Sequence, residues 1–134
     1  MKLHLTNSDG NYLITGYDQG WVEINRQRYN HNLVLLPNQI IENWDASIFD
    51  KIKAEHFEDI ATLNPEVVLL GTGKTHQFLH PKVSALFSQK GISLECMTTA
   101  AACRTYNILM SEGRNVAVAL IAITVLSAPL AASL

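Results

Sequence analysis

The segment "GTGKT" at residues 71–75 contains the residue types that hold phosphate groups in nucleotide-binding loops. A P-loop needs another glycine five residues before Gly73, and that position is Val68. A dinucleotide-binding fingerprint needs glycine three residues after Gly73, and that position is His76. Pro81 follows too soon for a long helix to begin directly after the loop. The spacing therefore argues against a nucleotide site.

Two interpretations of this glycine loop remain open. In the first, the loop is a turn in which Gly71 and Gly73 adopt backbone dihedrals closed to other residues. In the second, its exposed N–H groups form a small anion-binding concavity that Lys74 strengthens. Position favours considering the second, because ligands of open α/β sheets bind beyond the carboxyl ends of parallel strands. The next strand ends at Met97, and a helix begins at Thr98-Thr99 beside the same rim.

The helix expected at 99–112 carries a mixed set of polar and apolar residues. On a helical wheel one arc is polar and the opposite arc is apolar. The polar arc comprises Arg104, Thr105, Asn107, Ser111 and Glu112, and the apolar arc comprises Ala102, Cys103, Tyr106, Leu109 and Met110. Ala101 and Ile108 interrupt the polar arc, which suggests partial cover. A covered Arg104 would require a carboxylate or an anion as partner.

This pattern supports two hypotheses. In the structural one, Arg104, Glu112 and Arg114 form a network, with Asn107, that ties the end of the helix to the sheet. In the functional one, a small anionic ligand binds at the rim. The hypothetical ligand-binding set is then Gly71, Thr72, Gly73, Lys74, Thr98, Thr99, Arg104 and Arg114. No catalytic residue can be assigned.

The histidines and cysteines offer little further chemistry. His76 and His80 are four residues apart, but Pro81 disfavours helical geometry at His80, so we expect no metal site. Cys103 could be a nucleophile near a helix N-terminus, yet it lies on the apolar arc, which favours a buried small hydrophobe. The same holds for Cys96. Two thiols seven residues apart also fit a reducing compartment.

Composition indicates a globular protein of one domain. The chain has 134 residues, of which 48% are hydrophobic and 16% are charged, with a net charge of −2. Its basic residues are too scattered for nucleic acid to be the main partner. Residues 1–10 do not resemble a signal peptide. The uncharged segment 115–134 has the length of a membrane span, but Pro129 interrupts it, and its β-branched part, Val116–Leu126, favours a buried strand.

The hydrophobic pattern predicts the order of the elements. Short strands at 12–17, 21–25 and 33–36 indicate N-terminal hairpins, with a polar connection at 25–32. From residue 54 onward we expect helices at 55–63, 81–90 and 99–112, and strands at 67–70, 92–97 and 116–123. The resulting fold class is α/β. We expect a single three-layer domain in which N-terminal β-hairpins precede a β-α-β-α-β unit with a mainly parallel central sheet.

The ordered motifs Gly71-Thr72-Gly73, Met97-Thr98-Thr99 and "AACRTYNILMSEGRNVAVAL" at 101–120 carry a family resemblance. The chain resembles the family of the mitochondrial NADH dehydrogenase (complex I) assembly factor 3, whose bacterial and archaeal members have no assigned role. The resemblance covers residues 12–123. Members commonly have Asp where this chain has Thr98, so any role of that carboxylate is absent here.

The resemblance implies a soluble, cytoplasmic, non-enzymatic protein that acts as an interaction or assembly factor. It implies protein partners in respiratory or membrane-assembly machinery, without stable membrane insertion and without a cofactor. It leaves a homo-oligomer open. The alternative is a protein or enzyme that binds a small anion or metabolite at the rim. We expect one domain over 1–134, with its core at 12–123 and a C-terminal tail at 124–134.

Overall fold

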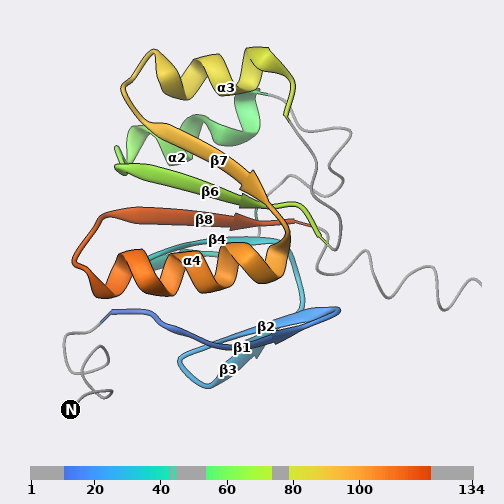
Figure 1. Ribbon diagram of the computed structural model, residues 1–134. Helices are drawn as coiled ribbons and strands as arrows, with labels where there is room; N and C mark the ends of the chain where they lie inside the picture. Colours follow the sequence, from blue (N-terminus) through green and yellow to red (C-terminus); the bar gives the residue numbers. More distant parts are fainter. Residues whose placement is uncertain (1–10, 43, 45–53, 74–78, 122–134) are drawn as a thin grey trace, which may run out of the picture.

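A computed structural model describes residues 11–42, 44, 54–73 and 79–121 (Figure 1). The N-terminal part contains only strands: β1 (Ile14–Asp18), β2 (Trp21–Ile24), β3 (Gln27–Tyr29), β4 (Leu33–Leu36) and β5 (Gln39–Ile41). Strands and helices alternate in the remainder: η2 (Ala54–Phe57), α2 (Glu58–Thr62), β6 (Val67–Gly71), α3 (Pro81–Ser88), β7 (Ser93–Met97), α4 (Thr99–Ser111) and β8 (Val116–Leu120).

Five strands form the central sheet in the order β5-β4-β8-β6-β7. β6 lies between β7 and β8 and is parallel to both, as the β-α-β-α-β pattern predicts. β4 is antiparallel to β8 and to β5, so the sheet is mixed. The carboxyl ends of the three parallel strands therefore lie at the same end of the sheet. β4 and β5 complete the sheet beside β8.

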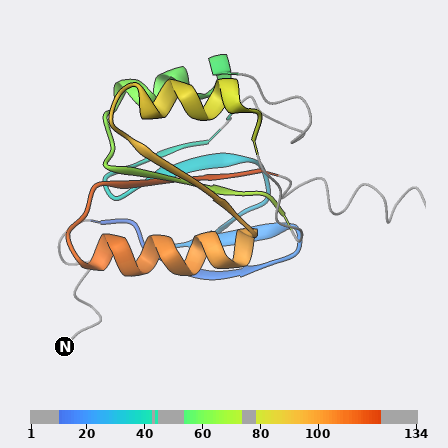
Figure 2. The same ribbon diagram turned by 45° about the horizontal axis from the view of Figure 1, so that its top comes forward.

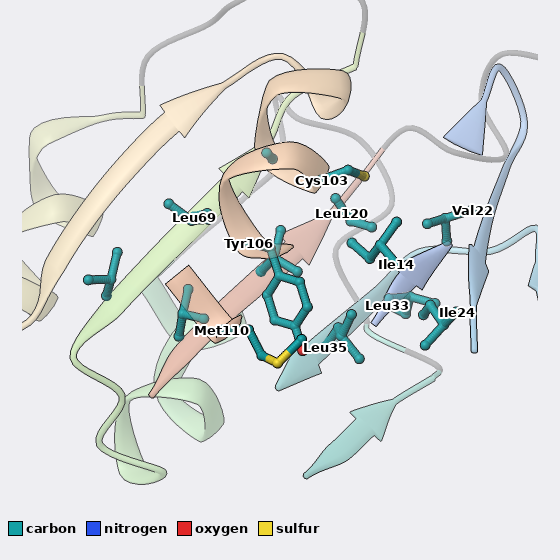
Figure 3. Packing of buried hydrophobic residues seen from close by; sticks show 14 residues of the cluster. Ile14, Val22, Ile24, Leu33, Leu35, Leu69, Cys103, Tyr106, Met110 and Leu120 are labelled. Atoms are coloured by element: carbon teal, nitrogen blue, oxygen red, sulfur yellow. The ribbon is translucent and has the colours of Figure 1, made fainter. Parts of the chain in front are cut away.

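Both faces of this sheet are covered (Figures 1 and 2). On one face Val34, Val68 and Ala119 pack with the buried side chains of η2, α2 and α3. On the other face Leu35, Leu69 and other strand residues pack beneath α4 and the N-terminal strands, as Figure 3 shows. Every residue of β8 is buried, which confirms the prediction of a strand that is apolar on both sides. Burial of these side chains is the main source of stability.

A second sheet of three strands, in the order β1-β2-β3, packs beside α4 (Figure 1). The β1–β2 hairpin turns at Gln19-Gly20, where Gly20 has φ 87°, as the sequence predicts. The β2–β3 turn contains Asn25 and Arg26, with φ values of 49° and 73°. Consecutive positive φ values are characteristic of the type I′ turns that close two-residue hairpins.

The α/β class is confirmed, while two predicted details were wrong. Residues 25–32 are not only a connection, because they contain β3. The stretch after Pro37 contains β5, which the sequence did not reveal. Both strands have only three residues. Within the described part of the chain, no helix is long and apolar enough to cross a membrane. The predicted tail at 124–134 lies outside the described residues.

Candidate functional site

The glycine bend after β6 lies against the start of α4, as the sequence predicts. Two hydrogen bonds join them directly: the Gly73 N–H donates to Thr99 Oγ1 at 2.9 Å, and the Thr99 N–H donates to the Gly73 carbonyl at 2.9 Å. Thr72 donates from its backbone N–H and its hydroxyl to the Met97 carbonyl, at 2.8 and 3.2 Å. The carboxyl ends of β6 and β7 and the first turn of α4 therefore form one rim.

Close packing at this rim explains why glycine is needed at Gly71. A Cβ atom there would lie 2.9 Å from Leu120 Cδ2 and 3.1 Å from Thr99 Cα. Gly73 serves a different purpose, because its φ of 94° lies in the left-handed region that disfavours other residues. The structure thus supports the interpretation of the loop as a turn closed to side chains.

In the described part of the rim, the loop N–H groups expected to bind an anion already have protein partners. Thr72 and Gly73 both direct their N–H groups at protein oxygens. In the first turn of α4, the Thr98 hydroxyl accepts from Ala101 and the Thr98 carbonyl accepts from Ala102. Thr98 is therefore the N-cap of α4, a position at which Ser, Thr, Asp and Asn are preferred. Lys74 lies outside the described residues.

These contacts predict that the rim does not take up an inorganic anion. Ligand binding stabilises the folded state in proportion to RT ln(1 + [L]/Kd), so a bound anion would raise Tm progressively. We expect phosphate to change Tm no more than chloride does at matched ionic strength. A phosphate-specific, saturable rise that disappears in Thr99→Ala would instead support the ligand-binding set.

Arg104 lies near this rim but is not covered. The side chain is exposed, and its Nη1 donates to the Tyr17 hydroxyl at 3.1 Å. Tyr17 belongs to β1, so the contact joins α4 to the small sheet. The partial cover suggested for Arg104 is absent, so the guanidinium is hydrated by solvent and needs no carboxylate or anion as partner.

Arg114 lies at the opposite end of the parallel strands, where β6 and β8 begin. It follows α4 and precedes β8, and its Nε donates to Glu66 Oε1 at 3.2 Å, just before β6 begins. The 13 residues of α4 span about 20 Å at 1.5 Å per residue. Arg114 therefore shares neither the rim nor a network with Arg104. Glu112 is exposed and acts as the C-cap residue, so the predicted Arg104–Glu112–Arg114 network was wrong.

Glu66 makes this end of the sheet sensitive to pH. The backbone N–H of Asn115 and the side chain of Arg114 both donate to the Glu66 carboxylate and lower its pKa. Because the pKa is lowered in the folded state, the stabilisation is complete above the unfolded-state pKa and is lost as pH falls through the folded-state value. Urea unfolding at a series of pH values should show Glu66→Gln less stable than wild type at neutral pH, with a difference that shrinks in acid. Glu58→Gln, at an exposed position of α2, is the control. A difference independent of pH would contradict this account.

Asn107 and Tyr106 attach the small sheet to α4. Asn107 Oδ1 accepts from the Ile14 N–H at 2.9 Å, and its Nδ2 donates to the Ile14 carbonyl at 2.8 Å. The Tyr106 hydroxyl donates to the Tyr12 carbonyl at 2.8 Å. The Asn107 amide thus pairs with β1 as a neighbouring strand would. Asn107 thus bonds to β1, whereas the predicted network joined it to Glu112.

Cys103 is a core residue and not a nucleophile. It lies on the buried face of α4, and burial raises the pKa of its thiol to about 12 despite the opposing effect of Arg104. Burial also raises the pKa of Cys96, on β7, although the Leu79 backbone partly opposes this shift. Since the thiolate is the reactive form, neither cysteine is activated.

The burial of Cys103 predicts its reactivity. In a Cys96→Ser variant, a water-soluble disulfide reagent at neutral pH should release thiolate only as fast as the protein unfolds. Addition of urea should expose one equivalent of reactive thiol. Rapid labelling of the folded variant would contradict the buried position of Cys103.

His80 has a structural role at the start of α3. Its Nδ1 accepts from the Lys82 N–H at 3.1 Å, which makes it the N-cap of the helix. Among the described residues, no cluster of three or more His, Cys, Asp or Glu side chains could hold a metal ion. His76 lies outside those residues.

A groove that the sequence analysis missed runs between α3 and the outer side of β7. It has a volume of about 590 Å³, and its lining includes Ser84 and Ser88 of α3 and Leu94 and Glu95 of β7. A signal was present in the sequence. Ser93 and Glu95 alternate with Leu94 and Cys96, whereas β6 and β8 are apolar throughout. Such alternation indicates a half-exposed strand at the edge of a sheet.

Comparisons with known proteins agree with this geometry. The chain is 37% identical over 102 residues to the "13 kDa major membrane protein" of Francisella tularensis, covering 75% of this chain and 82% of that protein. It is 39% identical over 90 residues to mouse "NADH dehydrogenase (ubiquinone) 1 alpha subcomplex assembly factor 3", covering 66% of this chain and 48% of the relative. The chain therefore spans about half the length of that assembly factor.

A solved structure and a family model both match most of the chain. The crystal structure of a Bordetella parapertussis protein that is 38% identical superposes with a TM-score of 0.78, covering 83% of this chain and 95% of that chain. The family model described as "Protein of unknown function (DUF498/DUF598)" matches residues 14–121, which include every strand and helix described above. The chain therefore belongs to this DUF498/DUF598 family.

Proposed function

We propose that this protein is a non-enzymatic factor that acts through contacts with other proteins during assembly of a membrane complex. Respiratory NADH dehydrogenase is the first candidate, because several relatives are named as its assembly factors. The site of action that we propose is the cytoplasm. The family description itself assigns no function.

The proposal rests on the contacts that three polar side chains make. Thr72, Thr99 and Asn107 all direct their side chains to backbone groups of neighbouring elements. A catalytic centre instead needs polar groups that converge on a space where a substrate can sit. These side chains hold β6, β7, α4 and β1 together, which suits a rigid scaffold that presents its surface to a partner.

The test is genetic and biochemical, in the organism that encodes the chain. We expect deletion to lower the amount of assembled NADH dehydrogenase on native gels, while its subunits are still synthesised. A tagged copy should restore assembly and recover subunits of the complex by affinity capture. The Glu58→Gln variant, at an exposed position of α2, is the matched control and should also restore assembly. Wild-type amounts of the complex in the deletion strain would overturn the proposal.

A further inference from the structure

β7 is an edge strand with hydrogen-bonding groups that no described residue uses. It pairs only with β6 in the described part of the chain. The Ser93 N–H donates to the Glu66 carbonyl, and the Met97 carbonyl accepts from Thr72, so Ser93, Glu95 and Met97 face β6. In a parallel ladder the intervening residues face away. The N–H and C=O groups of Leu94 and Cys96 therefore point to the open edge.

The groove beside this edge can accommodate an added strand. It is bounded by the outer side of α3, where Ser84 and Ser88 are exposed. The Leu94 and Cys96 side chains point to the α3 face of the sheet, where they pack partly against its core. The exposed Glu95 side chain alternates with them and lies on the opposite, α4 face. An incoming strand would thus contact a small, partly apolar surface on one face and a carboxylate on the other.

Glu95 argues against a second copy of this chain as the occupant. Each copy of β7 offers four groups at its open edge, the N–H and C=O of Leu94 and of Cys96. Two antiparallel copies related by a two-fold axis use all of these groups only when Leu94 of one copy pairs with Cys96 of the other. That register places the two Glu95 carboxylates directly opposite each other, which destabilises a strand pair. A register shifted toward Ile92 fails because the Ile92 N–H already donates to the Phe87 carbonyl at 2.9 Å. A charged residue in the middle of an edge strand is a known obstacle to self-association.

We propose that β7 and the α3 groove bind an extended segment of another protein as an additional antiparallel strand, with a basic residue opposite Glu95. The inference rests on the proposed function, for which it names the contact surface. Main-chain hydrogen bonds to Leu94 and Cys96 hold the segment. Its alternate residues are small and apolar over the α3 groove, and the residue between them is Lys or Arg.

A capped peptide of sequence TVKVT is the probe. In an antiparallel pair its lysine lies opposite Glu95, and its valines lie opposite Leu94 and Cys96. Titration of the isotopically labelled protein should shift the amide signals of Leu94 and Cys96, and leave Ile40 of the opposite edge strand β5 unchanged. The peptide N-methylated at both valines should not bind. The charge-reversed peptide TVEVT should bind up to about fivefold more weakly, as expected for one cross-strand charge pair.

Two variants sharpen the test. Glu95→Lys should reverse the preference, so that TVEVT binds better than TVKVT. Ser88→Arg should abolish binding by filling the groove, and Glu58→Arg, on α2, should not. The inference is overturned if no β7 amide shifts up to the solubility limit of TVKVT, or if Glu95→Lys keeps the original preference. It is also overturned if the wild-type protein sediments as a dimer that Ser88→Arg dissociates, because a second copy would then occupy the edge.

Different results would contradict the proposed binding surface and the proposed function. If Ser88→Arg recovers NADH dehydrogenase subunits as well as wild type does, the function stands and the surface is wrong. If TVKVT binding follows Glu95 but deletion of the gene leaves the complex intact, the surface stands and the function is wrong.

Discussion

Replacing Gly71 by alanine is expected to lower the free energy of unfolding by about 1–3 kcal/mol, the usual cost of overpacking a core. The added Cβ would lie 2.9 Å from Leu120 Cδ2, which can rotate away, and 3.1 Å from Thr99 Cα, which cannot. Relief therefore requires the start of α4 to move from β6. Urea denaturation of the variant measures the loss, and the amide resonances of α4 should show the displacement.

Gly16→Ala is the matched control. A Cβ at Gly16 would meet its nearest neighbour, a carbon of the Trp21 ring, at 3.4 Å, which is ordinary contact. Alanine also reduces the conformational entropy of the unfolded chain, so we expect a change below about 1 kcal/mol, in the stabilising direction. Equal destabilisation by both variants would show that steric crowding at Gly71 is not the cause.

Replacing Asn107 by leucine should lower the free energy of unfolding by about 2–4 kcal/mol. Leucine has a similar size but cannot pair with Ile14, whose N–H and C=O both bond to the Asn107 amide. Each buried backbone group left without a partner costs about 1–3 kcal/mol. Ile14 is only 5% exposed, so water cannot readily replace the lost bonds.

Hydrogen exchange identifies the origin of this loss. The Ile14 amide should exchange much faster in Asn107→Leu, while the β6 and β8 amides keep their protection relative to global unfolding. Ser111→Ala, one turn further along α4, is the control, because its hydroxyl bonds only to the Ile108 carbonyl of its own helix. We expect a change within about 0.5 kcal/mol there. Unchanged exchange at Ile14 would contradict the proposed pairing.

The sequence predicted best the elements that carry strong local signals. Continuous apolar runs identified β6 and β8, because buried parallel strands lack polar faces. Pro81 is the first residue of α3, and Gly113, with φ 81°, follows the C-cap of α4, so these residues bound the helices predicted at 81–90 and 99–112. The meeting of the glycine bend with α4 also followed from strand direction alone.

The short edge strands could not be predicted because their signal is tertiary. In β3, Gln27 and Arg28 are exposed, so no apolar pattern distinguishes the strand from a loop. Its turn uses Arg26 at a positive φ, where glycine would have given a recognisable hairpin signal. The antiparallel pairing of β4 with β8 depends on packing against a strand more than 80 residues away, which local sequence cannot encode.

The grouping of Arg104 with Arg114 failed for a geometric reason. Arg114 follows the C-terminal end of α4, whereas the rim lies at the N-terminal end of that helix. Arg104 and Arg114 are separated by most of the length of α4, and they bond to Tyr17 and Glu66 at different ends of the molecule. The polar arc was identified, but it does not form one site.

The position of β8 determines when the sheet can form during synthesis. β8 lies between β4 and β6, yet it is made after every other strand of the sheet. Until β8 leaves the ribosome, β4 and β6 have no strand between them, and the central sheet cannot bury their apolar side chains completely. Folding of this domain is therefore completed only after most of its sequence has been translated, and the nascent chain is a natural client for chaperones throughout that interval.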